Sequence, residues 1–360
     1  MNSSVQAHID LIALQHNYRQ IRRLTSSSRI MAMVKSNAYG HGLVQIAKSL
    51  TDVDAFGVAC LNEALMLRKA GVIKRIVLTR GFSDVTELPL IGKYGLDIVV
   101  HHESQIEILQ TVKLNKPVSV WLKIDTGMHR LGFSQQEAEY AYDRLSKISQ
   151  VQQPIYIMTH LASADDLFKS TTREQLDYFK RFSFCSNPKS IANSAAIINW
   201  SESCADWVRP GIMLYGVSPL ADKTGKEISL RPVMTLQSEL IAVKKLAKGD
   251  RVGYGGVWEC PEDMPVGVVA IGYGDGYPRH AKTGTPVLVN GIRCQIVGRV
   301  SMDMLTVDLR NNPGAKCGDE VVLWGKGLPV EYIAKYADTI SYELLCGLTQ
   351  RVQFIYESED

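Results

Sequence analysis

Lys35 stands at the end of an apolar run in the stretch MAMVKSNAYGHG (31–42), with Tyr39 and His41 close behind it. A lysine in this position is either a solvated cap on a strand or an amine that the fold places for chemistry. For this stretch alone the cap is the more common explanation. The chemical alternative is a Schiff base, which a lysine amine forms with a carbonyl group or with pyridoxal phosphate.

Further polar residues follow later apolar runs in the same manner. They are Lys123 and Arg130, His160, Asn193 and Ser194, and Arg209 with Gly211 and Ile212. Each also has an ordinary structural explanation. A lone histidine is usually a hydrogen-bonded structural residue, an Asn-Ser pair can cap a helix, and a glycine after proline suits a turn. Their meaning depends on whether the fold brings them together.

The first 216 residues alternate short apolar runs with amphipathic, helix-like stretches such as 62–71 and 136–148. Several runs are β-branched and apolar on both faces, as expected of strands that are covered on both sides. Eight such units predict a (β/α)8 TIM-type barrel, and no G-x-G-x-x-G of an open dinucleotide-binding sheet follows the first strand. The eight runs are 29–35, 54–60, 75–81, 96–102, 117–125, 154–160, 190–195 and 206–212.

The chain changes character after about residue 226. Strand-like segments follow one another, and Asn290-Gly291 predicts a hairpin turn between two of them. The segment DKTGKE (222–227) is the predicted linker. We therefore expect an α/β protein with an N-terminal barrel over 1–226 and a C-terminal, mostly-β domain over 227–360.

A barrel would gather the polar residues that follow its strands on one face, where active sites of this fold lie. The loops after strands seven and eight usually form its phosphate site. Ser194 can donate its hydroxyl there, and Gly211 and Ile212 can offer backbone N–H groups. A lysine and a phosphate site on one face predict pyridoxal 5′-phosphate as the cofactor.

Composition excludes several other classes. Forty basic residues against thirty-seven acidic ones give a net charge of +3, so no nucleic-acid partner is expected. Seven scattered cysteines without a C-x-x-C pair predict neither a disulfide framework nor a metal site. No signal peptide or membrane-length run is recognisable, which predicts a cytoplasmic protein without a membrane partner.

These residues belong to motifs by which the chain resembles the alanine racemase family, fold-type III pyridoxal phosphate enzymes, over essentially its whole length. The motifs are VKSNAYGHG (34–42), KIDTGMHRLGF (123–133), THLASAD (159–165), ANSAA (192–196), RPGIMLYG (209–216), VGYGG (252–256), GYGDGYPR (272–279), VSMD (300–303) and ISYELLC (340–346).

The resemblance implies a two-base racemisation of alanine, with Lys35 on one face of the substrate and Tyr254 on the other. Residues expected around the cofactor are Lys35, Tyr39, Arg130, His160, Asn193, Ser194, Arg209, Gly211, Ile212 and Tyr342. Residues expected at the substrate are Arg130, Met302 and Asp303, and those expected at its entrance are Asp165, Tyr273 and Arg279. Lys123 corresponds to a lysine that is carbamylated in some members.

Two points concern the surroundings of these residues. Ser190 stands where some members carry a histidine that supports the arginine near the cofactor ring, so the support of Arg209 is open. Lysine and tyrosine have ordinary pKa values of about 10, so both bases need nearby positive charge to act near neutral pH. We expect His160 and Arg209 to supply it to Tyr254.

The resemblance also implies a homodimer with shared active sites. A racemase of another small amino acid such as serine is an alternative, because one hydroxyl is poorly rejected by an apolar pocket. A fold-type III decarboxylase and a non-catalytic pyridoxal phosphate carrier fit less well; carriers of that kind lack the β domain. D-alanine supply for peptidoglycan and alanine catabolism both remain open as roles.

Overall fold

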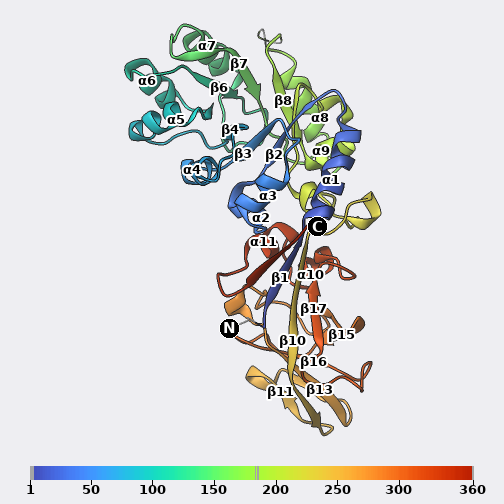
Figure 1. Ribbon diagram of the computed structural model, residues 1–360. Coiled ribbons are helices and arrows are strands. Elements are labelled where there is room, and N and C mark those ends of the chain that lie inside the picture. Colours follow the sequence, from blue (N-terminus) through green and yellow to red (C-terminus); the bar gives the residue numbers. More distant parts are fainter. Residues whose placement is uncertain (1–3, 183, 185, 359–360) are drawn as a thin grey trace.

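Eight parallel strands form a closed barrel in one lobe of the molecule (Figure 1). The computed structural model describes residues 4–182, 184 and 186–358. The barrel closes where Arg29 of the first strand pairs with Trp207 of the last. Its strands are β2 (Arg29–Met33), β3 (Ala55–Val58), β4 (Arg75–Leu78), β5 (Asp97–Val100), β6 (Val118–Lys123), β7 (Val151–Met158), β8 (Lys189–Asn193) and β9 (Trp207–Arg209). Each predicted run contains or overlaps one of them, so the predicted barrel is confirmed.

Helices cover the outside of the barrel, so its strands are buried on both faces. Strands β3, β5 and β6 are fully buried. They are α1 (Leu11–Leu24), α3 (Leu43–Ser49), α4 (Leu61–Lys69), α5 (Leu88–Tyr94), α6 (Glu103–Thr111), α7 (Gln135–Ser146), α8 (Thr171–Phe179) and α9 (Ser194–Asn199). The short α2 (Lys35–Tyr39) lies at the barrel mouth. Among the helices of the described residues, none has the length and apolar character needed to cross a bilayer.

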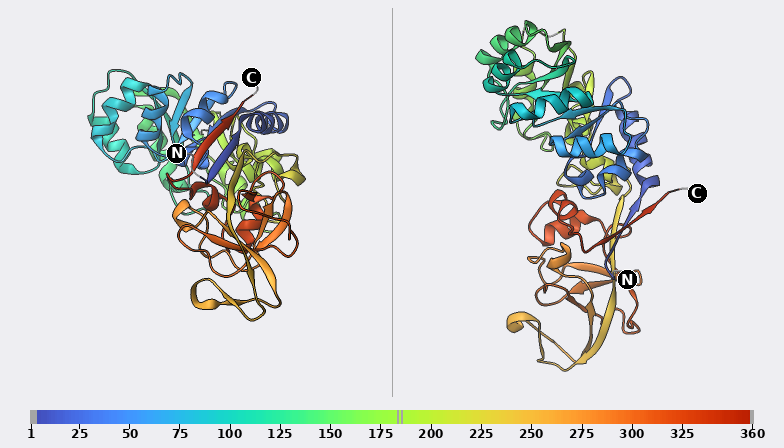
Figure 2. Two further views of the ribbon diagram at one scale, coloured as in Figure 1. Left: turned by 60° about the horizontal axis from the view of Figure 1, so that its bottom comes forward. Right: turned by 60° about the vertical axis from the view of Figure 1, so that its left-hand side comes forward.

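The second lobe is built on an eight-stranded sheet (Figure 2). Its strand order is β13-β16-β15-β14-β17-β10-β1-β18, and β10 also pairs with β13, which closes a loop of six strands. The strands are β1 (Gln6–Asp10), β10 (Met234–Leu246), β13 (Met264–Val269), β14 (Pro286–Val289), β15 (Ile292–Ile296), β16 (Leu305–Asp308), β17 (Glu320–Trp324) and β18 (Gln353–Glu357). Both residues of the predicted hairpin turn, Asn290 and Gly291, have positive φ, as a type I′ turn requires.

Smaller elements complete the second lobe. The short β11 (Arg251–Val252) and β12 (Trp258–Glu259) form a hairpin at its far end, and two helices, α10 (Val330–Tyr336) and α11 (Ser341–Cys346), face the barrel. Between β11 and β12 lies the single 3-10 turn η5 (Tyr254–Gly256). The C-terminal domain is therefore mostly β, as predicted.

The chain crosses between the lobes twice. Strand β1 precedes the barrel in sequence, yet it pairs with β10 and β18 of the second sheet. The division of the chain at residue 226 stays a prediction, and it did not anticipate this first strand. The predicted linker 222–227 is packed rather than loose, because Gly225 N–H donates to the Glu331 carboxylate of α10 at 2.8 Å.

A polar and aromatic cluster lies at the opposite end of the barrel from α2. The Asp97 carboxylate, 6% exposed, accepts from Trp121 Nε1 at 2.9 Å and lies 3.4 Å from the guanidinium of Arg75. Tyr156 stacks on Trp121, with 4.3 Å between ring centroids. Burial raises the pKa of Asp97 to about 6, although Arg75 and the Trp121 hydrogen bond pull it down. This end of the barrel is built for packing, as the N-terminal face of such barrels generally is.

The Asp97→Asn substitution should change how stability depends on pH. Asp97 has a pKa of about 6 in the folded chain, against an ordinary value of 3.8, so the folded state holds an extra proton between these values. Wild type therefore loses stability as the pH rises through that window, and the variant does not. The free energy of unfolding should shift in favour of the variant by up to about 3 kcal/mol from acid to neutral pH. Denaturant unfolding followed by tryptophan fluorescence measures it, and a difference independent of pH would contradict the burial of a charged Asp97.

Candidate active site

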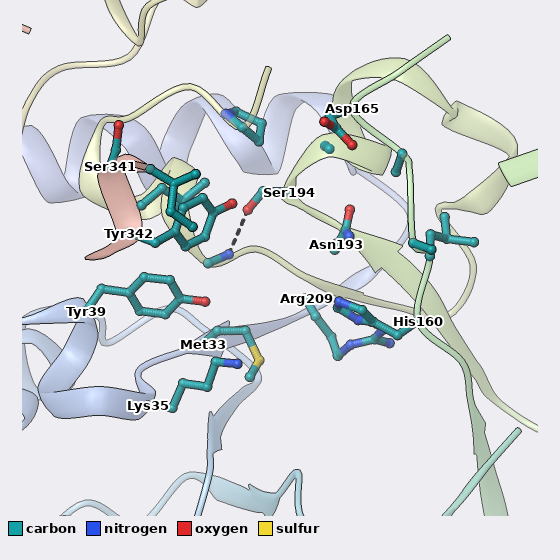
Figure 3. A pocket seen from close by; sticks show the side chains of 18 of the residues that line it. Met33, Lys35, Tyr39, His160, Asp165, Asn193, Ser194, Arg209, Ser341 and Tyr342 are labelled. Carbon is teal, nitrogen blue, oxygen red and sulfur yellow. Dashed lines mark hydrogen bonds between the residues drawn. The ribbon is translucent and has the colours of Figure 1, made fainter. Parts of the chain in front are cut away.

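A cavity of about 1020 Å³ opens at the C-terminal ends of the barrel strands (Figure 3). Loops after several strands line it, together with α10 and α11 of the second lobe. The expected site residues found in its wall are Lys35, Tyr39, Lys123, Arg130, His160, Asp165, Asn193, Ser194, Arg209, Gly211, Ile212 and Tyr342. Residues that stand up to about 300 positions apart in the chain thus share one wall, as parallel strands in a barrel require.

The chain turns in an unusual way directly after Lys35. Four consecutive residues, 36–39, have φ between 52° and 56°, which makes a left-handed helical turn. Residues with a Cβ disfavour this region by roughly 1–2 kcal/mol each. The turn is internally bonded, with Ala38 N–H donating to Val34 O at 2.8 Å and Gly40 N–H to Ser36 O at 3.0 Å. The backbone here has to be held in place by its surroundings.

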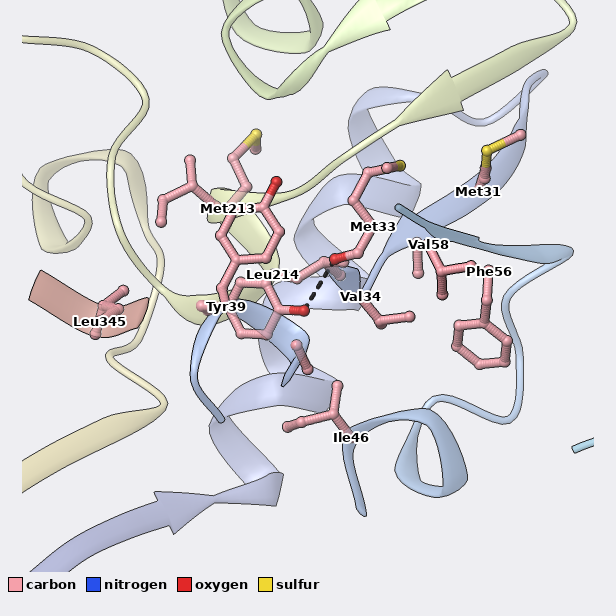
Figure 4. Close-up of a cluster of buried hydrophobic side chains, with 14 of the residues drawn as sticks. Met31, Met33, Val34, Tyr39, Ile46, Phe56, Val58, Met213, Leu214 and Leu345 are labelled. Atoms are coloured by element: carbon pink, nitrogen blue, oxygen red, sulfur yellow. Dashed lines mark hydrogen bonds between the residues drawn. The ribbon is translucent and has the colours of Figure 1, made fainter. Parts of the chain in front are cut away.

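Buried side chains hold the far end of this turn. His41 Nδ1 lies 2.8 Å from Tyr39 O, and the buried imidazole has a pKa lowered to about 4, so it is neutral and donates from Nδ1. Tyr215 packs between the two rings, 4.9 Å from Tyr39 and 4.5 Å from His41 by centroids. Its hydroxyl donates to Met33 O at 2.9 Å. Figure 4 shows the apolar side chains around this stack, which fix the Tyr39 ring at the cavity wall.

A second part of the wall is made where β8 and β9 end. Gly211 N–H donates to Ser194 Oγ at 2.8 Å, and a Cβ on Gly211 would lie only 2.4 Å from Tyr39 Oη. Three segments therefore converge around one small space that only glycine leaves open. Asn193 caps α9, with its side chain accepting from Ala196 N–H at 3.0 Å, so the capping explanation holds for Asn193 alongside its place in the wall.

Arg209, 5% exposed, is held by three acceptors, two in β8 and one directly after β7. It donates to Ser190 Oγ at 2.6 Å, to Thr159 O at 2.5 Å and to Ile191 O at 3.1 Å. Ser190 therefore supports the Arg209 guanidinium, at the position where some family members carry a histidine. Burial lowers the pKa of Arg209 to about 10, so it remains a cation near neutral pH.

Positive charge is concentrated in this cavity. Burial, followed by Arg209, Arg130 and Lys35, lowers the pKa of Lys123 to about 8. Burial and Arg130 also lower the pKa of Lys35, so both amines lose their protons more readily than an exposed lysine. The Arg130 loop is shaped by Asp125, which accepts from the N–H groups of residues 127–129 at 2.9 to 3.1 Å.

His160 corrects one expectation. Its imidazole lies 3.4 Å from the Arg209 guanidinium, and burial together with the neighbouring cations lowers its pKa well below the ordinary value. It is therefore neutral near pH 7 and does not supply positive charge. The sequence shows a histidine at the end of a strand but neither the burial nor the neighbouring cations that keep it neutral.

The structure does not bring the remaining expected residues into this cavity. Tyr254, in η5, is 68% exposed, and Met302 is 53% exposed. Gly274 N–H donates to Met302 O at 2.8 Å, and the Arg351 guanidinium bridges Asp275 and Asp303 at 3.0 and 2.8 Å. Tyr273, Met302 and Asp303 thus form a second cluster on the β lobe, with Tyr273 N–H donating to Ser301 O and Arg279 exposed nearby in the chain.

Sequence reasoning missed several residues around the site. Glu63 accepts from the N–H groups of Ser36 and Ala59, Tyr215 packs on Tyr39, and Cys346 lines the cavity. A glutamate in the first turn of a helix is common, so no local signal marked Glu63. Tyr215 stands within the motif RPGIMLYG (209–216), but its neighbour in the fold, Tyr39, is 176 residues away in the chain.

The chain is similar to alanine racemases along nearly its whole length. The alanine racemase N-terminal domain model matches residues 9–219, and the C-terminal domain model matches residues 233–356. An alanine racemase of Coxiella burnetii is 51% identical over 355 residues, covering 97% of this chain and 98% of that protein. One from Photobacterium profundum is 48% identical over 353 residues, with the same coverage.

Solved structures agree with these matches. The crystal structure of a biosynthetic alanine racemase from Pseudomonas aeruginosa superposes with a TM-score of 0.96 at 42% identity, covering 99% of this chain and 100% of that one. The structure of alanine racemase from Acinetobacter baumannii gives a TM-score of 0.94 at 38% identity with the same coverage. Sequence and fold together therefore show that this chain belongs to the alanine racemase family.

Proposed function

We propose that this protein interconverts L- and D-alanine, using pyridoxal 5′-phosphate bound covalently through Lys35. One observation carries the proposal beyond family membership. The Lys35 amine and the Ser194–Gly211 cradle lie in the same cavity, among several cations and with few acidic groups in its wall. An amine, a cradle of hydroxyl and backbone groups, and positive charge are what an aldehyde-bearing phosphate ester requires.

The residues present fit this cofactor. The space beside Gly211 would be filled by a Cβ, and Tyr39 Oη and Ser194 Oγ face it. Residues proposed to hold the phosphate are Tyr39, Ser194, Gly211, Ile212 and Tyr342. Arg209 is proposed to face the ring nitrogen and Arg130 the phenolic oxygen, with His160 and Asn193 beside them. When bound, the cofactor withdraws electrons from the substrate and makes its α-proton acidic.

The chain's own groups then move the proton. One base must remove it from one face of the α-carbon, and another must return a proton to the opposite face. We assign Lys35 and Tyr254 to these roles, with Met302 and the Asp303 segment at the substrate carboxylate. The lowered pKa of Lys35 suits proton transfer near neutral pH. Asp165, Tyr273 and Arg279 are proposed to line the approach to the site.

A dimer completes this assignment. Tyr254 and Met302 are exposed and lie outside the cavity that holds Lys35. Several apolar side chains near them or beside the cavity are also exposed, namely Val257, Met304 and Ile340. We propose a head-to-tail homodimer in which the β lobe of each subunit covers the barrel mouth of the other. Two-fold symmetry would then create two identical shared sites. A cytoplasmic location, and D-alanine supply for peptidoglycan or alanine catabolism, stay predictions.

The first test asks for the cofactor and the reaction together. Protein purified with pyridoxal phosphate should absorb visible light, and borohydride reduction followed by peptide mass analysis should place the cofactor on Lys35. L-alanine should lose its optical rotation, and L-serine should react more slowly. The Lys35→Ala variant is the control. A protein that binds no cofactor, or that leaves L-alanine unchanged, would refute the proposal.

The second test examines shared sites. Lys35→Ala and Tyr254→Phe variants, each nearly inactive, are unfolded, mixed and refolded. A mixed dimer would contain one site with both defects and one with neither. Random pairing makes about half of the dimers mixed, so about a quarter of the sites should recover. If mixed dimers form without any recovery, Lys35 and Tyr254 do not meet across the dimer.

The third test concerns Lys123, whose pKa of about 8 leaves part of it neutral at neutral pH. We propose that this amine combines with CO2, releasing a proton and leaving a carbamate anion among the neighbouring cations. Labelled bicarbonate should give a carbamate carbon signal in NMR that grows as the pH rises through about 8, because the neutral amine is the reactive form. The signal should vanish in Lys123→Arg and persist in Lys35→Ala. Its persistence in Lys123→Arg would place the modification elsewhere.

A further inference from the structure

Glu63 lies in the first turn of α4, close to the left-handed turn that follows Lys35. Its carboxylate contacts the backbone after two neighbouring barrel strands. We propose that Glu63 is a positioning residue, which ties the turn after Lys35 to the loop after β3 and thereby sets where the Lys35 amine lies in the cavity. This inference rests on the proposed function, because it concerns the placement of that amine.

The two oxygens of the carboxylate have separate partners. Glu63 Oε1 accepts from Ser36 N–H at 2.6 Å, and Oε2 accepts from Ala59 N–H at 2.7 Å. Ser36 directly follows Lys35, and Ala59 directly follows β3; both line the cavity. A hydrogen bond to an ionised carboxylate is roughly twice as strong as a neutral one. Glu63 therefore acts as a clamp between the ends of two adjacent strands.

Glu63 bonds to the end of the turn that lies next to Lys35. The far end of the turn is fixed by the buried stack of Tyr39, Tyr215 and His41. Asn37 Oδ1 accepts from Leu43 N–H at 2.8 Å, and this hydrogen bond also holds the part of the turn that lies farther from Lys35. Among the side-chain hydrogen bonds of the described residues, Glu63 makes the one that reaches the turn at Ser36, next to the reactive amine. Loss of this bond would free the lysine end and leave the tyrosine end in place.

The charge of Glu63 adds a second effect. Burial and Arg130 lower the pKa of Lys35, whereas Glu63 raises it. Glutamine at this position keeps the shape and one acceptor oxygen but loses the charge and turns an N–H donor toward one backbone N–H. Glu63→Gln should therefore disturb both the geometry and the protonation of Lys35 without leaving a hole.

The chain offers a matched control. Glu137 occupies the same place in the first turn of α7, and its carboxylate accepts from Ser134 N–H at 2.9 Å and from Ser134 Oγ at 2.7 Å. It lies on the outside of the barrel, away from the cavity wall. Glu137→Gln thus makes the same chemical change at an equivalent helix position without touching the Lys35 turn.

The experiment compares wild type, Glu63→Gln and Glu137→Gln in two states. In the cofactor-free protein, amide exchange by mass spectrometry should rise in the peptide covering 34–42 for Glu63→Gln alone. The pH at which pyridoxal phosphate attaches to Lys35 at half its maximal rate should move lower in Glu63→Gln, because the neutral amine reacts and its pKa has fallen. In the loaded enzyme, kcat should fall by about tenfold to a hundredfold while KM for alanine changes by less than about threefold.

The outcomes separate this inference from the proposed function. If wild type fails to bind the cofactor, the proposed function fails, while the exchange measurement still tests the clamp. If Glu63→Gln matches Glu137→Gln in exchange and in pH midpoint, the positioning role is overturned. It is also overturned if exchange rises uniformly along the chain and the melting temperature falls, because Glu63 would then be a general stabilising residue.

Discussion

The left-handed turn after Lys35 is the constraint on which the rest of the site depends. Four residues with a Cβ hold positive φ in succession, at a cost of roughly 4–8 kcal/mol if each contributes 1–2. Such a turn persists because contacts from several elements over-determine it. The second lobe also packs against the end of this turn. Gly40 lies so close to α11 that a Cβ on it would be 1.9 Å from Leu345 O. The amine is thus fixed by a strained backbone that both lobes support.

The charge of the cavity follows from this placement. Burial and, after it, the neighbouring cations lower the pKa of Lys123 and keep His160 neutral, because Lys35, Arg130 and Arg209 each disfavour another positive charge nearby. Such a site binds an anion with little competition from its own acidic groups. A phosphate, a carboxylate or a carbamate formed on Lys123 would each relieve the repulsion. The burial and the crowding of cations that lower the pKa of Lys35 and Lys123 favour their neutral amine forms.

The residues proposed to act on the substrate are divided between the two lobes. The barrel carries Lys35 and the proposed phosphate cradle, whereas the β lobe carries Tyr254 and Met302 on an exposed surface. Strand β1 and the packed segment 222–227 connect the lobes at two points. The lobes are therefore not joined by a single flexible linker. The exposure of Tyr254 and Met302 on a firmly attached lobe is what the proposed shared site would require.

Local sequence patterns determined much of this molecule. Eight short runs predicted the eight barrel strands, and several of them are apolar on both faces, because burial on both sides of a parallel sheet leaves a signal within a few residues. Asn290-Gly291 predicted its turn for a similarly local reason, since both residues tolerate positive φ. The position of Lys35 at a strand end, combined with the order of the strands, was enough to place it at the barrel mouth with Ser194 and Gly211.

Other features were decided only by the tertiary structure. Nothing in SNAY indicates four left-handed residues, because that conformation is imposed by distant partners such as Glu63, Tyr215 and Leu345. The neutrality of His160 and the support of Arg209 by Ser190 depend on charges and acceptors brought together from separate strands. The place of strand β1 in the second sheet could not be predicted, because its pairing partners lie more than 220 residues further along the chain. Burial and long-range pairing are properties of the assembled fold, so short-range patterns do not contain them.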